Sequence, residues 1–318
     1  MPTYNCAEYI SDAINSILMQ TYKDFEFLII DDGSTDDTAK ILHQLTDSRI
    51  RVISVDHCGK SAALNLGLNE ASHNLILHMD ADDIAHPKLL ENQIFLYGKK
   101  SRQTWVGCNY AVFDEKTKKI TFLVRNRIKH EEIVAAMSLH GAIAHGGSIV
   151  DRQFLIKAGG YKELDAFGDY EFWLRGIRDF YFENNQEILL YVRSRSNSLS
   201  RSNINYKYKL HYEIQRPYYS NMEYYFKINN ITNQISIRGW REFFYGDKNK
   251  ARMYWLQDKR CFFRDYRIAL AFLLTKLPET MLTLWKENRV RYRMKYWIKI
   301  LTKENRIIRA DFNKLVQK

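Results

Sequence analysis

The sequence predicts an α/β protein with a mostly parallel sheet and helices on both of its faces, followed by a mainly helical region. Over the first hundred residues, apolar residues at helical spacing alternate with short apolar runs, and two of these runs end abruptly in acidic turns. Alternating helices and buried strands indicate a parallel sheet, because each connecting helix covers one face of it. A change of charge along the chain marks off the helical region.

Each expected element follows from one of two periods in the apolar residues. Recurrence every three or four residues predicts helices over residues 9–18, 36–45, 60–71, 87–97, 130–139 and 169–178. Short apolar runs predict strands over residues 25–30, 51–55, 74–79, 105–112, 120–124, 148–150 and 187–192. The strands over 105–112 and 120–124 are close enough in sequence to form a hairpin. Pro87 opens its helix, because the fixed φ of proline suits the first helical position.

The bulk composition limits the class of protein. With 318 residues, of which 46% are hydrophobic and 14% aromatic, the chain can bury a sizeable core, which argues against disorder. Its four cysteines lack the spacing of a zinc site or a secreted disulfide scaffold and favour a reducing cytosol. No secretory signal is expected, and Lys276, Pro278 and Glu279 interrupt the most apolar stretch. We therefore expect a cytoplasmic protein without a membrane-spanning helix.

Charge divides the chain into two regions. Residues 1–200 contain 22 Lys and Arg against 27 Asp and Glu, whereas residues 201–318 contain 26 against 10. The Ser, Arg and Asn-rich stretch over residues 193–205 is the expected boundary, so we expect a first domain of residues 1–200 and a basic second region of residues 201–318. A segment this basic is expected where a protein meets a polyanion, such as a lipid surface or a nucleic acid.

Two acidic clusters follow predicted strands. Asp80-Ala81-Asp82-Asp83 comes after one strand, and Asp31-Asp32-Gly33-Ser34-Thr35-Asp36 after another. Ligands gather where parallel strands end, and paired carboxylates there suit a Mg²⁺ or Mn²⁺ ion that bridges a diphosphate. The alternative is a pair of solvated turns in which Asp, Ser and Thr cap the helices that follow.

Five motifs stand in the order and spacing of one enzyme family. They are Pro2-Thr3-Tyr4-Asn5, the run over residues 20–26 that leads into the first acidic cluster, Ser61-Ala62-Ala63-Leu64-Asn65, the second acidic cluster, and Gly168-Asp169-Tyr170-Glu171-Phe172-Trp173. Through these motifs, residues 1–200 resemble the family 2 inverting glycosyltransferases of bacterial polysaccharide and lipid-glycan synthesis. The resemblance implies a hexosyltransferase with a GT-A fold. It also implies a nucleoside diphosphate sugar as donor and a metal ion held by DxD-type acids.

The resemblance assigns the donor site to residues near the start of the chain. Asp32 would accept a hydrogen bond from the ring N–H of a uracil, which favours a UDP-sugar. Lys60 opens a predicted helix, where its charge adds to that of the helix N-terminus and suits a diphosphate, although an ordinary exposed lysine is an equal alternative. The expected lining of the base and ribose pocket is Pro2, Thr3 and Tyr4.

The resemblance assigns the metal and the chemistry to three other acids. Asp80 and Asp82 match the residues that contact ribose, diphosphate and metal, and Asp82 is the expected direct ligand of Mn²⁺ or Mg²⁺. Asp169 matches the general base, which would take a proton from the acceptor hydroxyl in a single displacement at the anomeric carbon. Because the base lies opposite the leaving diphosphate, the configuration would invert.

Several positions depart from the family pattern. Members begin with a buried strand, about six residues long, ahead of the Pro-Thr-Tyr-Asn turn at which this sequence starts, so a catalytically impaired, nucleotide-binding relative is an alternative. Gly168 replaces a common Glu, for which Glu171 could substitute. Arg195 stands in place of a His and could clamp a phosphate oxygen, or lie on the surface. His145 resembles a position near the acceptor, although a lone histidine is more often structural.

The basic second region mixes Tyr, Phe and Trp with Lys and Arg. Amphipathic helices of this composition lie in the headgroup layer of anionic membranes, which predicts a peripheral protein on the inner face of the cell membrane acting on a glycan or lipid-linked glycan acceptor. The alternative is a helical subdomain with solvated basic faces. Nucleic-acid binding is a weaker alternative, because no nucleic-acid module is present and the first region is acidic; we expect no nucleic acid as partner.

Overall fold

The computed structural model describes residues 1–100, 103–137, 141–164, 167–195, 210, 213–220, 222, 234–245, 247–258, 266–276 and 281. Contacts divide the chain into two compact units. The first contains residues 1–130 and 143–195, and the second contains residues 131–142 and the described residues from 210 onward. The boundary predicted at residue 200 lies outside the described residues and stays a prediction.

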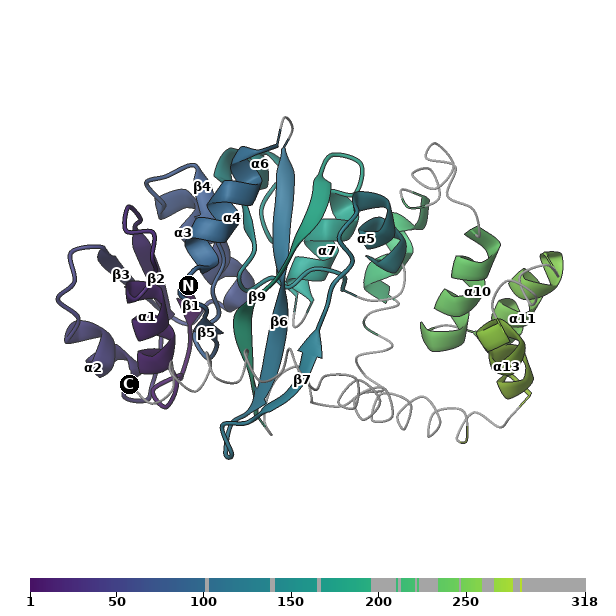
Figure 1. The fold of residues 1–318 in the computed structure, drawn as a ribbon, viewed down its shortest axis with the longest axis horizontal. Coiled ribbons are helices and arrows are strands. Elements are labelled where there is room, and N and C mark those ends of the chain that lie inside the picture. Colours follow the sequence, from purple (N-terminus) through teal and green to yellow (C-terminus); the bar gives the residue numbers. More distant parts are fainter. Residues whose placement is uncertain are drawn as a thin grey trace. The chain divides into compact units, whose positions relative to one another are not determined.

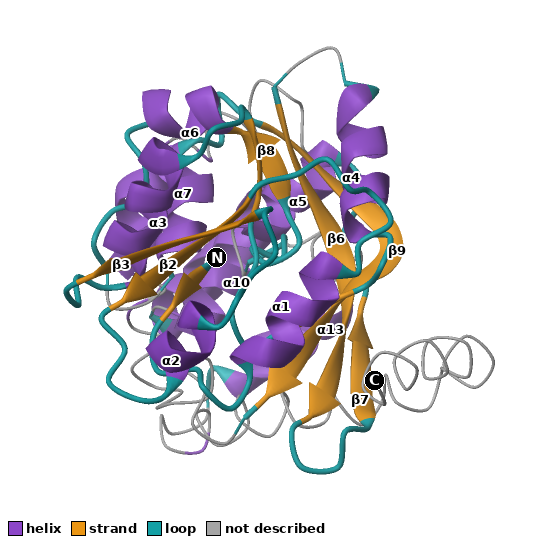
Figure 2. Cartoon of the chain, turned by 90° about the vertical axis from the view of Figure 1, so that its left-hand side faces the viewer, coloured by secondary structure: helices purple, strands orange, loops and turns teal. Residues whose placement is uncertain are grey.

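The first unit opens with a parallel three-stranded sheet in the order β1-β2-β3 (Figure 2). The apolar run of β2 (Phe27–Asp32) pairs over its whole length with β3 (Ile50–Val55), and on its other edge β1 (Pro2–Thr3) pairs with Ile30 and Asp31. The strand therefore extends through Asp31 and Asp32, which the sequence assigned to a turn. The helices of this part are α1 (Ile10–Leu18), α2 (Thr38–His43) and α3 (Lys60–Glu70).

A second, six-stranded mixed sheet has the order β4-β8-β6-β9-β5, with β7 paired to β6. The predicted hairpin is confirmed by the antiparallel pair β6–β7, and β6 runs parallel to β9 through the middle of the unit (Figure 1). The pairs β4–β8, β6–β8 and β5–β9 are antiparallel. The strands are β4 (Leu75–Leu77), β5 (Ile84–Ala85), β6 (Thr104–Asp114), β7 (Ile120–Val124), β8 (Ile149–Asp151) and β9 (Tyr181–Ser194).

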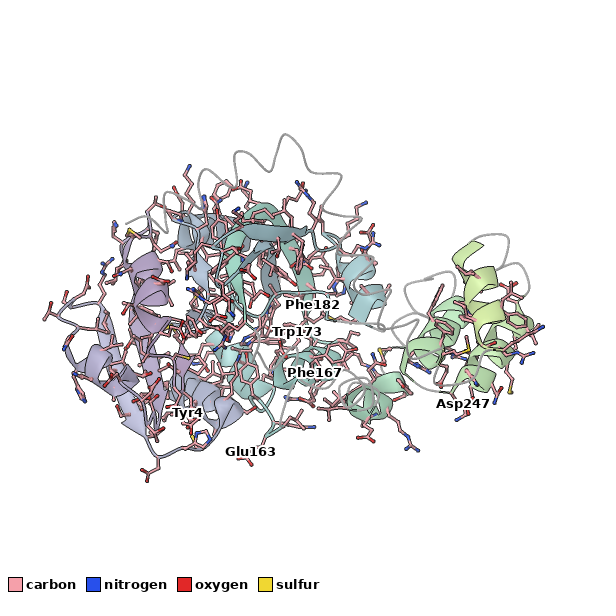
Figure 3. All side chains as sticks on the ribbon, turned by 90° about the horizontal axis from the view of Figure 1, so that it is seen from below. Tyr4, Glu163, Phe167, Trp173, Phe182 and Asp247 are labelled. Atoms are coloured by element: carbon pink, nitrogen blue, oxygen red, sulfur yellow. The ribbon has the colours of Figure 1, made fainter. Side chains whose placement is uncertain are left out.

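An aromatic cluster fixes the helix that carries the predicted base. Trp105 of β6 and Trp173 of α7 are fully buried and meet edge to face, with ring centroids 5.8 Å apart. Phe182 of β9 is also buried, and Trp173 and Phe182 both lie in the interior of the unit (Figure 3). Such rings bury large apolar areas, so this packing holds α7 against the sheet. The remaining helices up to residue 175 are α4 (Leu89–Gly98), α5 (His130–Met137), α6 (Arg152–Lys157) and α7 (Gly168–Arg175).

A cavity of ≈320 Å³ lies between the two sheets of the first unit. Its walls include Phe27 and Leu28 of β2, Leu77 of β4 and Gly67 of α3. On this edge β2 is paired only with the two residues of β1, and it makes no strand pair with β4. The largely apolar space therefore lies where a further strand could join the two sheets. Pro2 and Thr3, which the sequence assigned to a turn, form the two-residue strand β1 on this edge.

Replacing Gly67 with Ala is expected to stabilise the protein. A Cβ there would lie 3.6 Å from Ile30 Cγ1, an ordinary van der Waals contact at the wall of the cavity. Because Gly67 lies inside a helix, alanine also removes backbone freedom from the unfolded chain, and we expect the free energy of unfolding to rise by about 1 kcal/mol. Urea unfolding followed by circular dichroism measures the change. Gly107→Ala is the control, because its Cβ would clash with the side chain of Asn184 and should destabilise the protein.

Three helices of the second unit, α10 (Gln234–Tyr245), α11 (Lys248–Gln257) and α13 (Tyr266–Leu274), pack around Phe243 and Trp255, both fully buried. Asp247 caps α11 by accepting hydrogen bonds from the backbone of Asn249 and Lys250. The helical character predicted for this region is confirmed for these residues. Among the residues that the structure describes, no helix is long and apolar enough to cross a bilayer.

Candidate active site

Hydrogen bonds tie together the loops that follow β1 and β2. The side-chain oxygen of Asn5 accepts from the backbone N–H of Thr35 at 2.7 Å and of Asp36 at 3.3 Å. The carboxylate of Asp36 accepts from the backbone of Thr38 at 2.9 Å, and from that of Ala7 at 3.1 Å. Asp36 thus holds the turn before α2, whereas Asp37, the N-cap residue of that helix, makes no side-chain cap hydrogen bond. The two loops form one ordered rim above the carboxyl ends of these strands.

Asp32 anchors the loop that leads into α3. One carboxylate oxygen accepts from the backbone N–H of Cys58 at 2.7 Å and the other from that of Gly59 at 3.0 Å. Burial raises the pKa of Asp32, but these hydrogen bonds outweigh burial and lower it below its usual value. Asp32 is only 3% exposed, so its predicted contact with a uracil would use the remaining acceptor positions of an already bonded carboxylate. The role stays a prediction.

An exposed aromatic pair lies beside Asp32. The rings of Tyr4 and His57 stack with centroids 4.1 Å apart and an interplanar angle of 22°, and His57 Nδ1 lies 3.0 Å from an Asp32 carboxylate oxygen. Tyr4 is 42% exposed and projects at the edge of the first unit (Figure 3). A planar base can stack on such a surface. The sequence pointed to Tyr4 but not to His57, whose position follows only from the loop that Asp32 holds.

Each acid of the second cluster faces a different cationic residue. Asp80 accepts from Lys60 Nζ at 2.7 Å, Asp82 pairs with Arg195 at 2.5 Å, and Asp83 accepts from the backbone N–H of Arg193 at 2.9 Å. The expected strand before this cluster ends earlier, at Leu77, so the acids lie on a loop. The structure thus brings Lys60 and Arg195, which are 135 residues apart, to adjacent carboxylates.

The pKa values of the three carboxyls are shifted in different directions by burial and by neighbouring charges. Burial raises the pKa of Asp80, but the charge and hydrogen bond of Lys60, together with the charges of His145 and the N-terminus, lower it to about 2. Burial and the charge of Asp80 raise the pKa of Asp82, and burial with the charges of both neighbours raises that of Asp83 well above its usual value. The cluster therefore holds more acidic groups than its side-chain cations neutralise, which is the condition that an added cation relieves.

Asp80 and Asp82 fit a Mg²⁺ or Mn²⁺ site that the substrate completes. Both present carboxylate oxygens, the donors that these ions prefer, and Mg²⁺ commonly takes one or two carboxylates together with phosphate oxygens. Among the described residues, no group of three His, Cys, Asp or Glu side chains is placed to hold a metal by itself. The donor set is thus that of a shared site and not of a closed structural site.

Asp169 lies in the first turn of α7, and its carboxylate accepts from the backbone N–H of Tyr170 at 2.8 Å. A Cβ on Gly168 would lie 3.1 Å from Ser61 Oγ, so the start of α7 approaches the start of α3. The attraction of Asp80 raises the pKa of Lys60 against the effect of burial, and the charges of Asp169 and Asp82 raise it further. Three carboxylates from two separate segments, the acidic loop and the start of α7, therefore act on one lysine.

A buried chain of hydrogen bonds lies beneath the acids. The hydroxyl of Tyr161 is 2.8 Å from His78 Nε2 and 3.0 Å from His145 Nε2. Burial lowers the pKa of His145, partly offset by the charges of Asp169 and Asp80, and burial lowers that of His78 well below its usual value. The ring of His145 is thus bonded in the interior of the protein, and its predicted position near the acceptor stays a prediction.

These two histidines should make part of the stability depend on pH. A histidine whose pKa is lowered by folding stays neutral in the native state, so its contribution is present above the unfolded pKa of about 6.5 and declines below it. We expect the free-energy advantage of the wild type over His78→Gln/His145→Gln to shrink as the pH falls from 7 to 5, by at most about 1.4 kcal/mol per histidine per pH unit.

Urea unfolding at pH 7, 6 and 5 measures this difference. The raised pKa values of Asp82 and Asp83 act in the opposite direction, because those carboxyls gain protons more readily in the folded state. Asp82 and Asp83 are present in both the wild type and the double variant, so their contribution cancels in the difference between the two proteins. An advantage that stays constant from pH 7 to 5 would contradict the assignment of neutral histidines.

Glu171 is placed away from the acids that meet at Lys60. It is 3% exposed and forms ion pairs with Arg175 at 3.2 Å and with Lys162 at 3.0 Å. Arg175 also donates to the backbone oxygen of Gly160 at 2.6 Å, so these contacts hold the segment before α7. A contact with acceptor stays a prediction for Glu171, and its position favours a structural role.

Comparison with known proteins identifies the family. Residues 1–159 match the family model described as Glycosyl transferase family 2. EpsE of Bacillus subtilis (strain 168), named as a glycosyltransferase, is 30% identical over 220 residues, which cover 65% of this chain and 76% of EpsE.

Two solved structures share the fold. S. aureus TarS (1–349) in complex with UDP-GlcNAc has a TM-score of 0.57 and 16% identity, with coverage of 86% of this chain and 82% of TarS. The mannosyltransferase PcManGT of Pyrobaculum calidifontis, in complex with GDP-Man and Mn²⁺, has a TM-score of 0.55 and 16% identity, with coverage of 93% and 83%. With its mixed α/β architecture and its acids at the ends of the strands, the chain belongs to glycosyl transferase family 2 and is a glycosyltransferase of the GT-A fold.

Proposed function

We propose that the protein transfers a hexose from a nucleoside diphosphate sugar, with UDP as the nucleotide, to a hydroxyl of a glycan or lipid-linked glycan, with inversion at the anomeric carbon. The observation that carries this proposal is the approach of three segments: Lys60 at the start of α3 donates to Asp80 in the loop that also carries Asp82, and the start of α7 with Asp169 lies against the start of α3. These residues come from three separate segments, and each is of the type that donor binding or proton transfer requires.

The donor nucleotide would bind along the rim above β1 and β2. Tyr4 and His57 offer a stacked surface for the base, and Asp32 lies 3.0 Å from His57 Nδ1. Pro2 and Thr3 pair with the end of β2, and they would line the base and ribose pocket beside this surface. Lys60 begins α3, so a diphosphate there would meet both its ammonium and the backbone N–H groups of the helix terminus.

Mn²⁺ or Mg²⁺ would be held by Asp82 and Asp80. The excess of acidic groups in this cluster supports the assignment, as does the Mn²⁺ in the complex of PcManGT. When bound, such an ion stabilises negative charge on the leaving diphosphate. Lys60 would orient the same phosphates, since its Nζ lies 2.7 Å from an oxygen of Asp80.

Asp169 would act as general base. Its carboxylate is half-buried at the start of α7, and its hydrogen bond with Tyr170 N–H fixes its direction. It would accept the proton of the acceptor hydroxyl as the hydroxyl oxygen bonds to the anomeric carbon and the bond to the diphosphate oxygen breaks. Inversion follows because the attacking oxygen and the leaving group lie on opposite faces of the sugar.

A thermal-shift screen of UDP-, GDP- and dTDP-sugars, each with and without 1 mM Mn²⁺, tests the proposal. A ligand that binds only the native state raises the stability by RT ln(1 + [L]/Kd), so a UDP-sugar at about a hundred times its Kd should add about 2.7 kcal/mol. We expect the largest shift with UDP-sugars in the presence of Mn²⁺. No shift with any nucleotide sugar would overturn the proposal.

A catalytically impaired, nucleotide-binding relative is the second candidate. The cavity of ≈320 Å³ beside β2, together with the two-residue strand β1, favours this alternative because it leaves the donor rim weakly supported. The two candidates differ in turnover. Release of UDP with transfer of the sugar to an acceptor supports the enzyme, whereas Mn²⁺-dependent binding without any release of UDP supports the impaired relative.

The acceptor side would lie on an anionic membrane surface. Both α11 and α13 pack into one buried cluster through other side chains, yet each exposes apolar residues that are 47 to 62% exposed: Met253, Leu256, Leu270 and Leu273. Exposed apolar side chains among basic residues suit the headgroup layer of a membrane. Co-sedimentation with liposomes of anionic and of neutral lipid at physiological salt tests this, and equal failure with both would refute it.

A further inference from the structure

Two arginines from the end of β9 lie against the acids of the candidate metal site. Arg193 is the last but one residue of the strand, and Arg195 follows two residues later on the same side. Their guanidinium carbons lie 4.8 and 5.0 Å from the ring centroid of Tyr9, so both cations contact one aromatic ring. The two side chains differ sharply in how firmly they are held.

Arg193 is fixed by several contacts of its guanidinium, although Nη1 has no hydrogen-bond partner among the described residues. Its Nε donates to the backbone oxygen of Asp82 at 2.8 Å, and Nη2 pairs with Asp12 at 2.9 Å. Its guanidinium also lies 4.9 Å from the centroid of Phe113, and its side chain is 1% exposed. Its direct contact with the acidic loop is to the backbone, so it holds the loop in place without occupying a carboxylate that the metal needs.

Among the residues that the structure describes, Arg195 pairs with a single carboxylate, that of Asp82. Its Nη2 lies 2.5 Å from Asp82 Oδ2, its Nε has no hydrogen-bond partner among the described residues, and its side chain is 27% exposed. Its guanidinium also lies over the ring of Tyr9. A partly exposed ion pair of this kind contributes little net stability, because solvent replaces it at small cost. Arg195 can therefore leave Asp82, whereas Arg193 cannot leave its site without losing several buried contacts.

Asp82 is also the residue assigned above as direct metal ligand. A guanidinium at 2.5 Å from Oδ2 occupies the oxygen that a divalent cation would approach, and two cations on one carboxylate oxygen repel each other. We propose that Arg195 is an exchangeable counter-ion: it competes with the divalent cation for Asp82, and after displacement its planar fork binds the diphosphate of the donor. The inference rests on the proposed function, since it requires a metal and a nucleotide at this site.

The exchange has a consequence that simple phosphate binding lacks. Arg195 should oppose the binding of Mn²⁺ alone and favour the binding of UDP once Mn²⁺ is present. Metal and nucleotide would thereby become coupled, because the guanidinium that the metal displaces gains its new partner only with the diphosphate. In the absence of the nucleotide sugar, the protein would bind the divalent cation only weakly.

The test measures two affinities with opposite expected signs in Arg195→Ala. Titration with Mn²⁺ alone, in which electron paramagnetic resonance measures the free ion, should show about a two- to fivefold tighter Kd, the factor that loss of a modest ion pair allows. Calorimetric titration with UDP at saturating Mn²⁺ should show about a tenfold or greater weakening, as expected for loss of a charged hydrogen bond to phosphate. Neither readout requires turnover.

Arg49→Ala is the matched control. Arg49 also pairs with a carboxylate, that of Asp47 at 2.8 Å, and lies over an aromatic ring, that of Phe25 at 4.7 Å. Its replacement removes one positive charge and both kinds of contact at a place that does not face the acids, so both affinities should match the wild type. Arg195→Lys should retain part of the competition with Mn²⁺ but lose the planar contact with the diphosphate.

The outcomes separate the inference from the proposed function. If the wild type binds neither Mn²⁺ nor UDP, the proposed function fails. If the wild type binds both, but Arg195→Ala matches Arg49→Ala or weakens Mn²⁺ and UDP together, the counter-ion inference alone fails. Tighter Mn²⁺ with weaker UDP in Arg195→Ala supports it.

Discussion

Asp169→Asn is expected to reduce sugar transfer by a factor of about 10²–10⁴, the contribution of a general base. The substitution keeps the size of the side chain and its acceptor oxygen for Tyr170 N–H, but removes the group that takes the proton. Release of UDP in the presence of acceptor measures turnover. Because Asp169 is assigned to the acceptor side, the affinity for UDP with Mn²⁺ should change by less than about threefold.

Asp179→Asn is the control for this prediction. Asp179 is exposed in the turn that follows α7, and its replacement removes the same charge from the same part of the chain. It should transfer sugar at the rate of the wild type. Normal turnover by Asp169→Asn would remove that residue from the mechanism, and loss of UDP binding in that variant would move it to the donor side.

The second large effect is expected at Asp80. Its pKa of about 2 means that it is fully ionised over the working range of pH, so Asp80→Asn removes one full charge from the metal and from Lys60. Loss of a metal ligand and of its ion pair should weaken Mn²⁺-dependent UDP binding by about a hundredfold or more, since one charged hydrogen bond alone contributes 1.5–3 kcal/mol. Calorimetric titration with UDP, once in the presence of Mn²⁺ and once after removal of metal with EDTA, measures the effect.

Asp83→Asn is the matched control in the same loop. Asp83 is buried, and its Oδ1 accepts from Arg193 N–H, a hydrogen bond that the amide oxygen of Asn can keep. We therefore expect nearly unchanged UDP binding. If Asp80→Asn bound UDP and Mn²⁺ like Asp83→Asn, the donor site would not lie at Asp80.

Several elements could be predicted because their period appears in the sequence itself. The apolar run of β2, the helical spacing of α1 and the hairpin of β6 and β7 are local patterns, and the structure confirms all three. β5 has only two residues, too few to show any period. The start of β9 was missed because Asn184 interrupts the apolar pattern, although its side chain is buried and donates to the backbone oxygen of Arg127.

The residues of the candidate site also fall into those that a local motif reveals and those that it does not. Asp32, Asp80, Asp82 and Asp169 could be selected from the order of their motifs, because each motif is local. His57 could not, since it reaches Tyr4 only through a loop whose shape depends on hydrogen bonds to Asp32. His78 and Tyr161 were missed for a similar reason: they are 83 residues apart, and neither lies in a motif.

The sequence by itself determined the α/β class, the family resemblance and the identity of the acids at the ends of the strands. These depend on periods and motifs within about ten residues of chain. Only the tertiary structure decided which cation faces which acid. Lys60 pairs with Asp80 and Arg195 with Asp82 because the start of α3 and the end of β9 converge on one loop, and such pairings depend on distances in space that no local pattern encodes.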